Sequence, residues 1–429
     1  MLITKSKNYK LGRLIEYLLY IFVFLIPWQT RYIYKYLSLG GEVFEYGKLA
    51  IYVSEAVLLL LIFLALFFLR TDKFKKIYLL PIVLLIISLL GYFNVLNYEM
   101  YFYGLGKLVE LVLLFLIISR LNFNYFKLFI SFIASIFLHC ALGFYQFFSQ
   151  NVLANKYLGI AGQSAYQGGV SVLEGGFGRF LRVYGGFSHP NILGGFIVIA
   201  ILFSIGIYLQ QKKPRYYFLF WPVLIIFSQV LIFTFSRSAI LALVIALIFL
   251  FFYAYQKKLL GKLFSILGVL ILVGAMNFVF FQDLMQSRLL GQDRLEIKST
   301  QERQILEVQA KKLLSTNFIF GQGINNYIPA VFNKVDNSLS VWQYQPAHNV
   351  YLLVLIELGI LGFLIYFSFI FYFLLLALKN KQILKFILGL SLIVILLISF
   401  FDHYFWTYWS GLAIIFLIIG LINKKQGVS

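Results

Sequence analysis

Long uninterrupted apolar runs recur along most of this 429-residue chain. A run of about 20 apolar residues, folded as a helix, is long enough to cross a hydrocarbon core about 30 Å thick. Only 12% of the residues are charged, whereas soluble domains carry roughly 25%. The sequence therefore predicts an all-α, polytopic membrane bundle with about twelve transmembrane helices. We expect one integral membrane domain over residues 1–429.

Hydropathy places the predicted spans near residues 14–30, 49–69, 77–95, 104–119, 126–148, 190–210, 217–235, 238–256, 263–281, 349–378, 386–401 and 404–422. Two of the connections between these spans are long and polar. Residues 150–189 form a glycine-rich first loop, and residues 282–347 form a larger loop between spans 9 and 10. Leu306, Ala310 and Leu313 recur at helical spacing in the larger loop, which predicts helices lying near the membrane surface.

The basic residues indicate how the chain is oriented. They gather in alternate connections, for example at Lys257, Lys258 and Lys262. Because cytoplasmic loops carry an excess of Lys and Arg, we expect both termini in the cytoplasm and both long loops on the outer face. The net charge of +20 is thus typical of juxtamembrane clusters. It indicates membrane lipids as partners and argues against nucleic-acid binding.

Arg237 stands in the short connection TFSRS between the predicted spans 7 and 8. A charge this close to the membrane core is costly, so a functional role is the default interpretation. The alternative is an arginine that extends to the interface and serves no further purpose. Arg182 precedes the segment YGGFSHPNILGG, where Asn191 is a candidate helix cap and Arg182 a candidate anion ligand.

The larger loop contributes Arg303, with Arg288 and Arg294 as competing candidates. His348 ends this loop at the start of span 10, where a histidine is able to act as a general base near neutral pH or simply to cap a helix. His139 lies inside an apolar span and is expected to be a core residue. Trp342, Tyr344 and Tyr351 near His348 are candidates for stacking on sugar rings.

The sequence has no GxxxxGK[ST], HExxH or GxSxG motif and no acidic cluster suited to a metal. We therefore expect no metal and no cofactor. Arginines bind phosphate oxygens in a bidentate manner and stabilise a leaving pyrophosphate as its charge develops. A histidine beside them is able to deprotonate an incoming hydroxyl.

Four segments, in this order, resemble the O-antigen ligase/polymerase superfamily. They are FSHPNILGG, TFSRSAILAL, the stretch from Arg303 to FGQG, and AHNVYLLVLIELGILG. The resemblance covers residues 180–365, and DHYFWT at 402–407 is similar to the segment before the last span in that family. It implies a membrane glycosyltransferase of the GT-C type, metal-independent and inverting. The implied donor is a glycan on undecaprenyl pyrophosphate, and the implied acceptor is a lipid or glycan at the outer face of the bacterial inner membrane.

The resemblance also implies roles for particular residues. Arg237 and Arg303 match the arginines that hold the pyrophosphate, with Arg182 as a third cation, and His348 matches the histidine that activates the acceptor. Glu307 departs from the family pattern, which has Trp at that position in many members, so Arg294 stays an alternative to Arg303. Other candidate contacts to acceptor or sugar are His189, Asn191, Asn349, Tyr351, Asp402 and His403.

A transporter or flippase of lipid-linked oligosaccharide is the alternative from another functional class. Such a protein is expected to bury charged groups along a path through its spans. Here the spans are nearly uncharged and the distinctive polar residues gather at one face. This asymmetry favours an enzyme, and the sequence leaves open whether it is a ligase or a polymerase.

Overall fold

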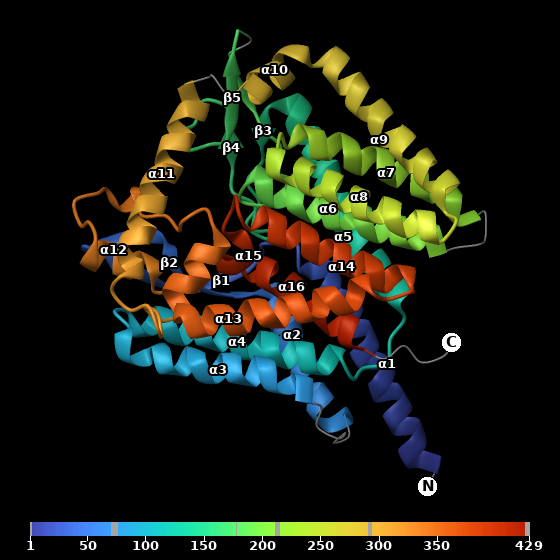
Figure 1. Ribbon diagram of the computed structural model, residues 1–429, viewed down its shortest axis with the longest axis horizontal. Coiled ribbons are helices and arrows are strands. Elements are labelled where there is room, and N and C mark those ends of the chain that lie inside the picture. The colour runs from blue at the N-terminus through green and yellow to red at the C-terminus, as the bar shows by residue number, and fades with distance from the viewer. Residues whose placement is uncertain (1, 70–75, 177, 211–214, 291–293, 425–429) are drawn as a thin grey trace.

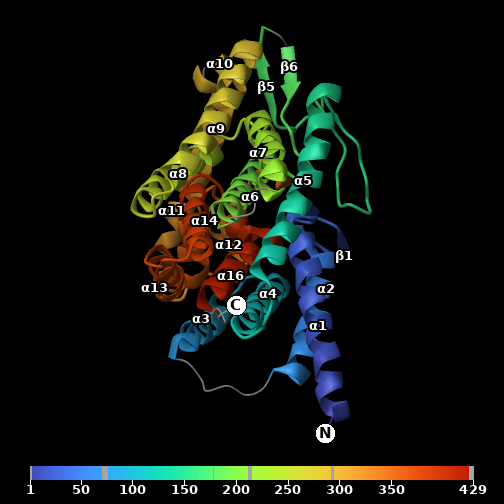
Figure 2. The same cartoon turned by 90° about the vertical axis from the view of Figure 1, so that its right-hand side faces the viewer.

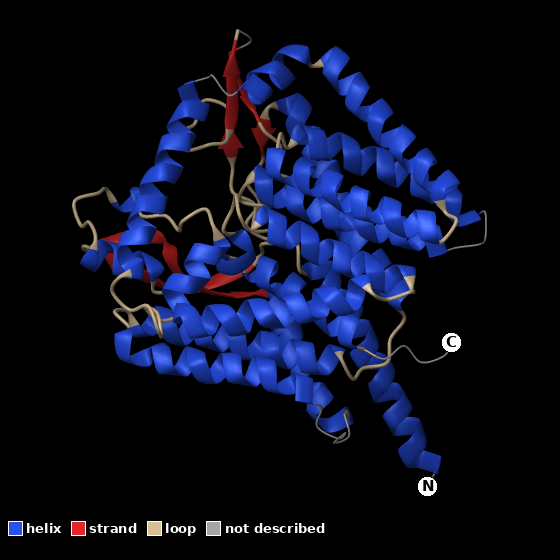
Figure 3. Cartoon of the chain, viewed as in Figure 1, coloured by secondary structure: helices blue, strands red, loops and turns tan. Residues whose placement is uncertain are grey.

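The computed structural model describes residues 2–69, 76–176, 178–210, 215–290 and 294–424. Helices dominate these residues, together with three two-stranded antiparallel sheets (Figure 3). Within the described ranges, seven helical segments are long and apolar enough to cross a membrane. They are Lys76–Asn94, which contains α3 (Leu79–Leu90), and α4 (Tyr98–Ile118), α5 (Tyr125–Ser149), α6 (Pro190–Gln210), α8 (Arg237–Gln256), α9 (Leu260–Phe280) and α13 (Val350–Leu378).

Other predicted spans correspond to shorter apolar helices. These are α2 (Val53–Phe68), most of α7 (Arg215–Phe233), α14 (Ile383–Ile398) and α16 (Trp409–Asn423), and α1 (Leu2–Leu25) stands at the first predicted span. The prediction of a polytopic helical membrane protein is confirmed. The count of twelve spans stays a prediction.

Figure 1 shows how the ends of the helices are grouped. Helix α8 ends, α9 begins and α13 passes into α14 on the right of that view, the side towards which α1 begins. Helices α11 (Arg294–Leu314) and α12 (Tyr327–Lys334) lie on the left. If successive loops lie on alternate sides of a membrane, as predicted, the helix ends have to gather on two opposite sides of the molecule in this way. Which end faces the cytoplasm stays a prediction.

A β-hairpin between α1 and α2 was not predicted. Strands β1 (Arg31–Leu39) and β2 (Glu42–Tyr52) pair antiparallel around Gly40 and Gly41, which both have positive φ, at 60° and 91°. Two glycines in this conformation suit a tight hairpin turn. Because β2 extends to Tyr52, helix α2 starts at Val53, later than the predicted span at 49–69.

The first long loop folds into two further small sheets rather than remaining irregular. Strands β3 (Asn151–Val152) and β4 (Gln163–Ser164) pair with each other, as do β5 (Val172–Gly175) and β6 (Gly178–Leu181). In the larger loop, α10 (Gln282–Leu290), α11 and α12 are followed by the short 3₁₀ turn Val341–Gln343. Leu306, Ala310 and Leu313 are buried, as the helical spacing predicted.

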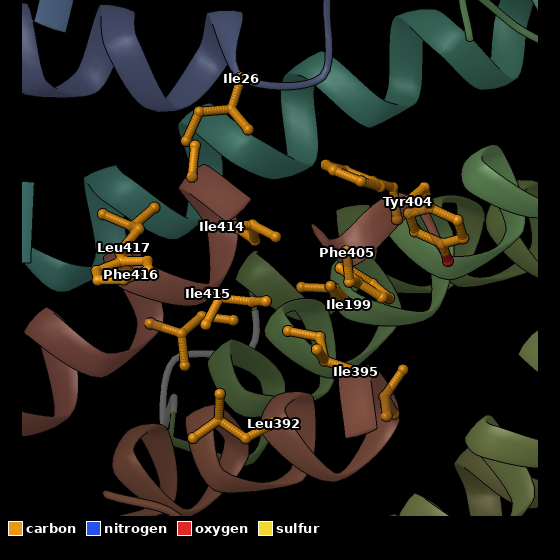
Figure 4. Close-up of a cluster of buried hydrophobic side chains, with 14 of the residues drawn as sticks. Ile26, Ile199, Leu392, Ile395, Tyr404, Phe405, Ile414, Ile415, Phe416 and Leu417 are labelled. Carbon is orange, nitrogen blue, oxygen red and sulfur yellow. The ribbon is translucent and has the colours of Figure 1, made fainter. Parts of the chain in front are cut away.

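Helix α6 is the centre of the bundle, and nearly all of it is buried. It packs against α5, α7, α8 and α14, and α14 packs in turn against α13 and α16. Figure 4 shows Ile199 of α6, Ile395 of α14 and Ile414 of α16 in one buried apolar cluster. Helices α1 and α2 lie side by side at one edge of the molecule (Figure 2). This packing fixes where the ends of α6, α8 and α13 meet.

Helix α13 is broken at Gly359, where φ is 67°. The segment 318–323, which contains the FGQG motif, pairs with the backbone at the break. Ile360 N donates to Phe318 O at 2.8 Å, and Gly323 N donates to Glu357 O at 3.0 Å. An apolar environment requires partners for exposed backbone groups, and this segment supplies them. The break therefore fixes the end of α11 to the first half of α13.

Candidate active site

Three arginines from three different elements line one pocket of about 240 Å³. Arg237 begins α8, Arg288 belongs to α10 and Arg303 to α11, three helices that Figure 1 shows around the upper half of the molecule. The other lining residues are Asn191, Ser238, Leu241 and Phe401. The lining therefore combines three guanidinium groups with an apolar side.

The connection between α7 and α8 positions Arg237. Phe235 has a positive φ of 49°, so the chain turns sharply and Arg237 becomes the first residue of α8. Its Nη1 donates to the carbonyl of Arg288 at 3.4 Å, and its side chain is exposed. An arginine at the end of a span, as the sequence predicted, thus faces the pocket from the helix N-terminus.

Arg288 is held against the same turn. Its Nε donates to the carbonyl of Phe235 at 3.0 Å. Burial lowers the pKa of Arg288 to about 8, and the charges of Arg182, Arg237 and Arg303 add to the decrease. Several like charges held together disfavour one another, and a bound anion relieves that repulsion. The pocket is therefore electrostatically suited to an anion.

The structure separates Arg303 from its alternative Arg294. Arg303 lines the pocket, whereas Arg294 is exposed and its Nη2 lies 3.1 Å from the Glu174 carboxylate. Glu307, where the family pattern differs, forms an ion pair with Lys311 at 2.8 Å on the exposed face of α11. The geometry therefore favours Arg303 as the loop arginine of the site.

Arg182 is bound on all sides by protein groups. Its Nε donates to Thr234 O at 2.8 Å, its Nη1 to Ser171 Oγ at 2.8 Å and its Nη2 to Asn191 Oδ1 at 2.7 Å. Burial lowers the pKa of Arg182 to about 10, and the charge of Arg303 contributes to the decrease. With Nε, Nη1 and Nη2 each bonded to a protein group, the Arg182 side chain is fixed in place and positions Asn191.

His348 lies beside a buried carboxylate. Its Nδ1 is buried and stands 3.7 Å from Asp402 Oδ1, while 24% of its side chain is exposed. Asp402 also accepts from the Asn191 amide at 3.0 Å and from the backbone N–H of His403 at 2.8 Å. Because Nδ1 faces the carboxylate, Nε2 is the nitrogen of His348 left for a substrate.

Asp402 is expected to stay ionised. Burial by itself raises the pKa of this carboxyl, but the neighbouring imidazole rings, first among them His348 at 3.7 Å, hold the pKa well below its usual range. Burial lowers the pKa of both His189 and His403 to about 3, so these two rings stay neutral. A fixed negative charge beside one partly exposed imidazole is the arrangement that orients a general base.

A family comparison agrees with this site. Residues 222–367 match the family model described as O-antigen ligase. This O-antigen ligase segment covers about a third of the chain and is what the chain shares with that family. No curated protein matches the chain. The resemblance noted in the sequence is therefore confirmed.

The O-antigen ligase segment contains Arg237, Arg288, Arg303 and His348. Asn191 and Asp402 lie outside it, on either side. The fold thus brings residues from before and after the ligase segment into the same site. The wider core predicted at 180–365 and the likeness of DHYFWT stay predictions.

His348, Asp402 and His403 also offer three potential metal-ligand atoms within 4.8 Å of one another. Two features oppose a cation there. His403 Nδ1 lies 2.6 Å from Thr407 Oγ1, so that nitrogen already has a hydrogen-bond partner. The nearby arginines repel a second positive charge. We therefore assign these residues to a hydrogen-bonded network, and the expectation of a metal-free site stays a prediction.

Several residues predicted to contact acceptor or sugar have partners within the protein, and their contact with a substrate stays a prediction. Asn349 caps α13 by accepting from Leu352 N at 3.2 Å. The ring of Tyr351 stacks on Phe367, and its hydroxyl donates to a carbonyl of α14. His189 accepts from the backbone N–H of Asn191 at 3.1 Å.

Of the aromatic residues predicted to stack on sugars, Tyr344 is buried and Trp342 is 67% exposed. His139 is a core residue, as predicted, and its ring lies 4.3 Å from Trp28 and 4.8 Å from Phe187.

Proposed function

We propose that this protein is a metal-independent, inverting glycosyltransferase that moves an oligo- or polysaccharide from undecaprenyl pyrophosphate to an acceptor hydroxyl. The observation that carries the proposal is the convergence of Arg237, Arg288 and Arg303 on one pocket. Guanidinium groups pair with phosphate oxygens in a bidentate manner. They suit a pyrophosphate whose negative charge increases as it leaves.

The apolar side of the pocket supports a lipid carrier. Leu241 and Phe401 line the pocket and are 46% and 44% exposed. Val244, Ile248 and Phe252 continue along α8 as exposed apolar residues. A polyprenyl chain would lie along such residues within the membrane while its pyrophosphate meets the arginines.

In the proposed reaction, His348 acts as general base. The acceptor hydroxyl passes its proton to Nε2 of His348, and the hydroxyl oxygen attacks the anomeric carbon of the donor. The bond between that carbon and the pyrophosphate oxygen breaks, and polyprenyl pyrophosphate leaves with the bonding electron pair. Asp402 is a positioning residue, since its carboxylate stabilises the imidazolium that forms. A single displacement of this kind inverts the anomeric configuration.

The proposed location is the bacterial inner membrane, with cytoplasmic termini and the site at the outer face. The basic clusters in alternate loops support this orientation. The pocket lies at the N-terminal end of α8, opposite the Lys257 and Lys258 turn that follows α8. The substrate would thus be reached from the side opposite the basic loops.

A transfer assay tests the proposal. Purified protein would be given an undecaprenyl pyrophosphate oligosaccharide alone, and then together with a lipid A–core acceptor, with a chelator present. A ladder from donor alone indicates a polymerase, and product that requires the acceptor indicates a ligase. Donor that binds without any product would overturn the proposal in favour of a transporter. Arg303→Ala serves as the inactive variant and Arg294→Ala as its matched control.

A further inference from the structure

A second pocket, of about 60 Å³, shares no lining residue with the arginine pocket. It is formed between β2, α4, the segment before α12, the short helix α15 (Tyr404–Thr407) and the start of α16. Its lining residues are Tyr52, Tyr103, Gly104, Lys107, Ile324, Asn325, Trp406, Thr407, Trp409 and Leu412. Nothing in the proposed chemistry of the arginines or of His348 uses it.

The aromatic residues of this second pocket have their polar atoms bound elsewhere. Trp406 Nε1 donates to the Glu357 carboxylate at 2.8 Å, and Trp409 Nε1 donates to Ser54 Oγ at 3.0 Å. The Tyr103 hydroxyl donates to a backbone carbonyl of β2 at 2.9 Å. Trp406 and Trp409 are only 4% and 5% exposed and form the back of the pocket, whereas Tyr103 is partly exposed and offers carbon surface in a fixed orientation.

One polar group of the pocket, the side-chain amide of Asn325, belongs to a partly exposed residue. Asn325 has a positive φ of 61°, and its side-chain amide has no hydrogen-bond partner among the residues that the structure describes. Gly104 makes room for it, since a Cβ at that position would lie 3.2 Å from the Asn325 side chain. Asn is one of the few non-glycine residues that adopt this left-handed conformation readily, so the backbone here holds the amide in a fixed position.

The net charge of the second pocket is close to zero. The Lys107 ammonium forms a buried ion pair with the Glu55 carboxylate, and it also lies over the rings of Tyr103 and Trp409. The arginine pocket, in contrast, is strongly cationic. The second pocket therefore suits an uncharged ligand with both apolar and hydroxyl-bearing surfaces.

The second pocket is linked to the proposed general base by direct contacts. Thr407, which lines it, lies 2.6 Å from His403 Nδ1 through its Oγ1. The ring of His403 lies 5.0 Å from the ring of His348. On its other side, His348 neighbours Asp402, which is bonded to Asn191 of the arginine pocket. A chain of contacts thus runs from one pocket to the other through His348.

We infer that the second pocket binds an uncharged sugar residue of the acceptor. The C–H face of a pyranose would pack against the partly exposed ring of Tyr103, and its hydroxyls would hydrogen-bond to the Asn325 amide. This inference rests on the proposed function. It places donor and acceptor on the two sides of His348, which receives the proton that passes between them.

Matched variants test the subsite. Asn325→Gly removes the amide while glycine keeps the positive φ. Tyr103→Ala removes the ring, whereas Tyr103→Phe keeps it. In the transfer assay, Asn325→Gly and Tyr103→Ala should raise KM for the acceptor about five- to tenfold, with KM for the donor unchanged. Tyr103→Phe should stay close to wild type. Lys258→Gly, at another positive-φ position, controls for the added glycine.

A second measurement separates this inference from the proposed function. Saturation-transfer NMR would detect binding of glucose, galactose and N-acetylglucosamine oligosaccharides to the intact protein without donor. Loss of that signal in Asn325→Gly supports the subsite even if no transfer is seen. Wild-type acceptor KM and wild-type sugar binding in both Asn325→Gly and Tyr103→Ala would overturn the subsite and leave the proposed function standing. A wild-type protein that binds no sugar and transfers none would overturn both.

Discussion

The side chain of Asn191 joins two charged residues of opposite sign. Its Nδ2 donates to Asp402 at 3.0 Å, and its Oδ1 accepts from Arg182 at 2.7 Å. Asn191 and Asp402 are 211 positions apart in the sequence. One amide thus ties the start of α6 to the carboxylate beside His348, so the orientation of the proposed general base depends on the position of the central helix.

Replacing the proposed base should stop the reaction. His348→Ala is expected to lower the transfer rate by at least about 100-fold, because general bases contribute this much or more. The measurement is product formation from lipid-linked oligosaccharide with acceptor present. Since His348 is partly exposed, the unfolding temperature should change little. Wild-type transfer by a well-folded His348→Ala protein would refute the assignment.

Asp402 should make stability depend on acidity. Its pKa is lower in the folded protein than in the unfolded chain, so its contribution is fully present above pH about 4 and fades as the pH falls towards the folded pKa. Asp402→Asn should therefore unfold at a lower temperature than wild type at neutral pH, and the difference should shrink below pH about 4. Thermal unfolding of both proteins from pH 7 to pH 3 measures this. A difference that widens at low pH would contradict it.

Lysine should not replace the pocket arginines. Arg303→Lys keeps the charge but loses the planar fork, and we expect a loss of transfer of about tenfold or more. Arg294→Lys is the matched control on the same helix, because Arg294 pairs with Glu174 outside the pocket. Kinetics of the two variants would be compared side by side. Equal activity of both would show that charge alone suffices or that Arg303 does not touch the donor.

Inorganic pyrophosphate should stabilise the protein. An anion that binds only the folded state adds about 2.7 kcal/mol at 100 times its Kd. We expect the unfolding temperature to rise with pyrophosphate at constant ionic strength, and this rise to be lost in Arg288→Gln. Acetate at matched ionic strength is the control for screening. The same rise in wild type and in Arg288→Gln would argue against a role for Arg288 in anion binding.

The break in α13 should tolerate no side chain. At Gly359 an added Cβ would lie 2.2 Å from the Ile319 carbonyl oxygen, and φ is 67°. Gly359→Ala should destabilise the fold by about 1–3 kcal/mol or more, as strained positions do. Gly268→Ala in α9 is the control, since nothing lies within 4 Å of its Cβ position. Unfolding temperatures in detergent would show a decrease for the first variant only.

The ends of the spans could be predicted from the sequence, whereas the contacts between the helices could not. Arg237 was found because two apolar runs are separated by so few residues, and the structure places it at the first position of α8. The choice between Arg303 and Arg294 was not possible, because helical spacing alone does not say which face of α11 meets α8 and α10. Arg288 was predicted only as an alternative to Arg303. Its hydrogen bond to Phe235 depends on how α10 folds back over the α7–α8 turn, which the sequence does not show.

The β1–β2 hairpin carried a signal that hydropathy obscured. Tyr32, Tyr34 and Tyr36 alternate before Gly40 and Gly41, a pattern typical of a strand and a tight turn. The apolar residues that follow in β2 merged with the next span. The pairing of Asp402 with Asn191 and His348 had no local signal at all, because it depends on how α6, α13 and α14 pack.

The three arginines that line one pocket also predict how the product leaves at the end of the proposed catalytic cycle. In the proposed reaction, the pyrophosphate oxygen that held the sugar gains a negative charge when the sugar leaves. Arg237, Arg288 and Arg303 would therefore bind the released polyprenyl pyrophosphate more tightly than the glycan-linked donor. We expect product inhibition, with departure of polyprenyl pyrophosphate setting the pace of turnover. An enzyme that hydrolyses the released pyrophosphate should then accelerate repeated cycles without touching this protein.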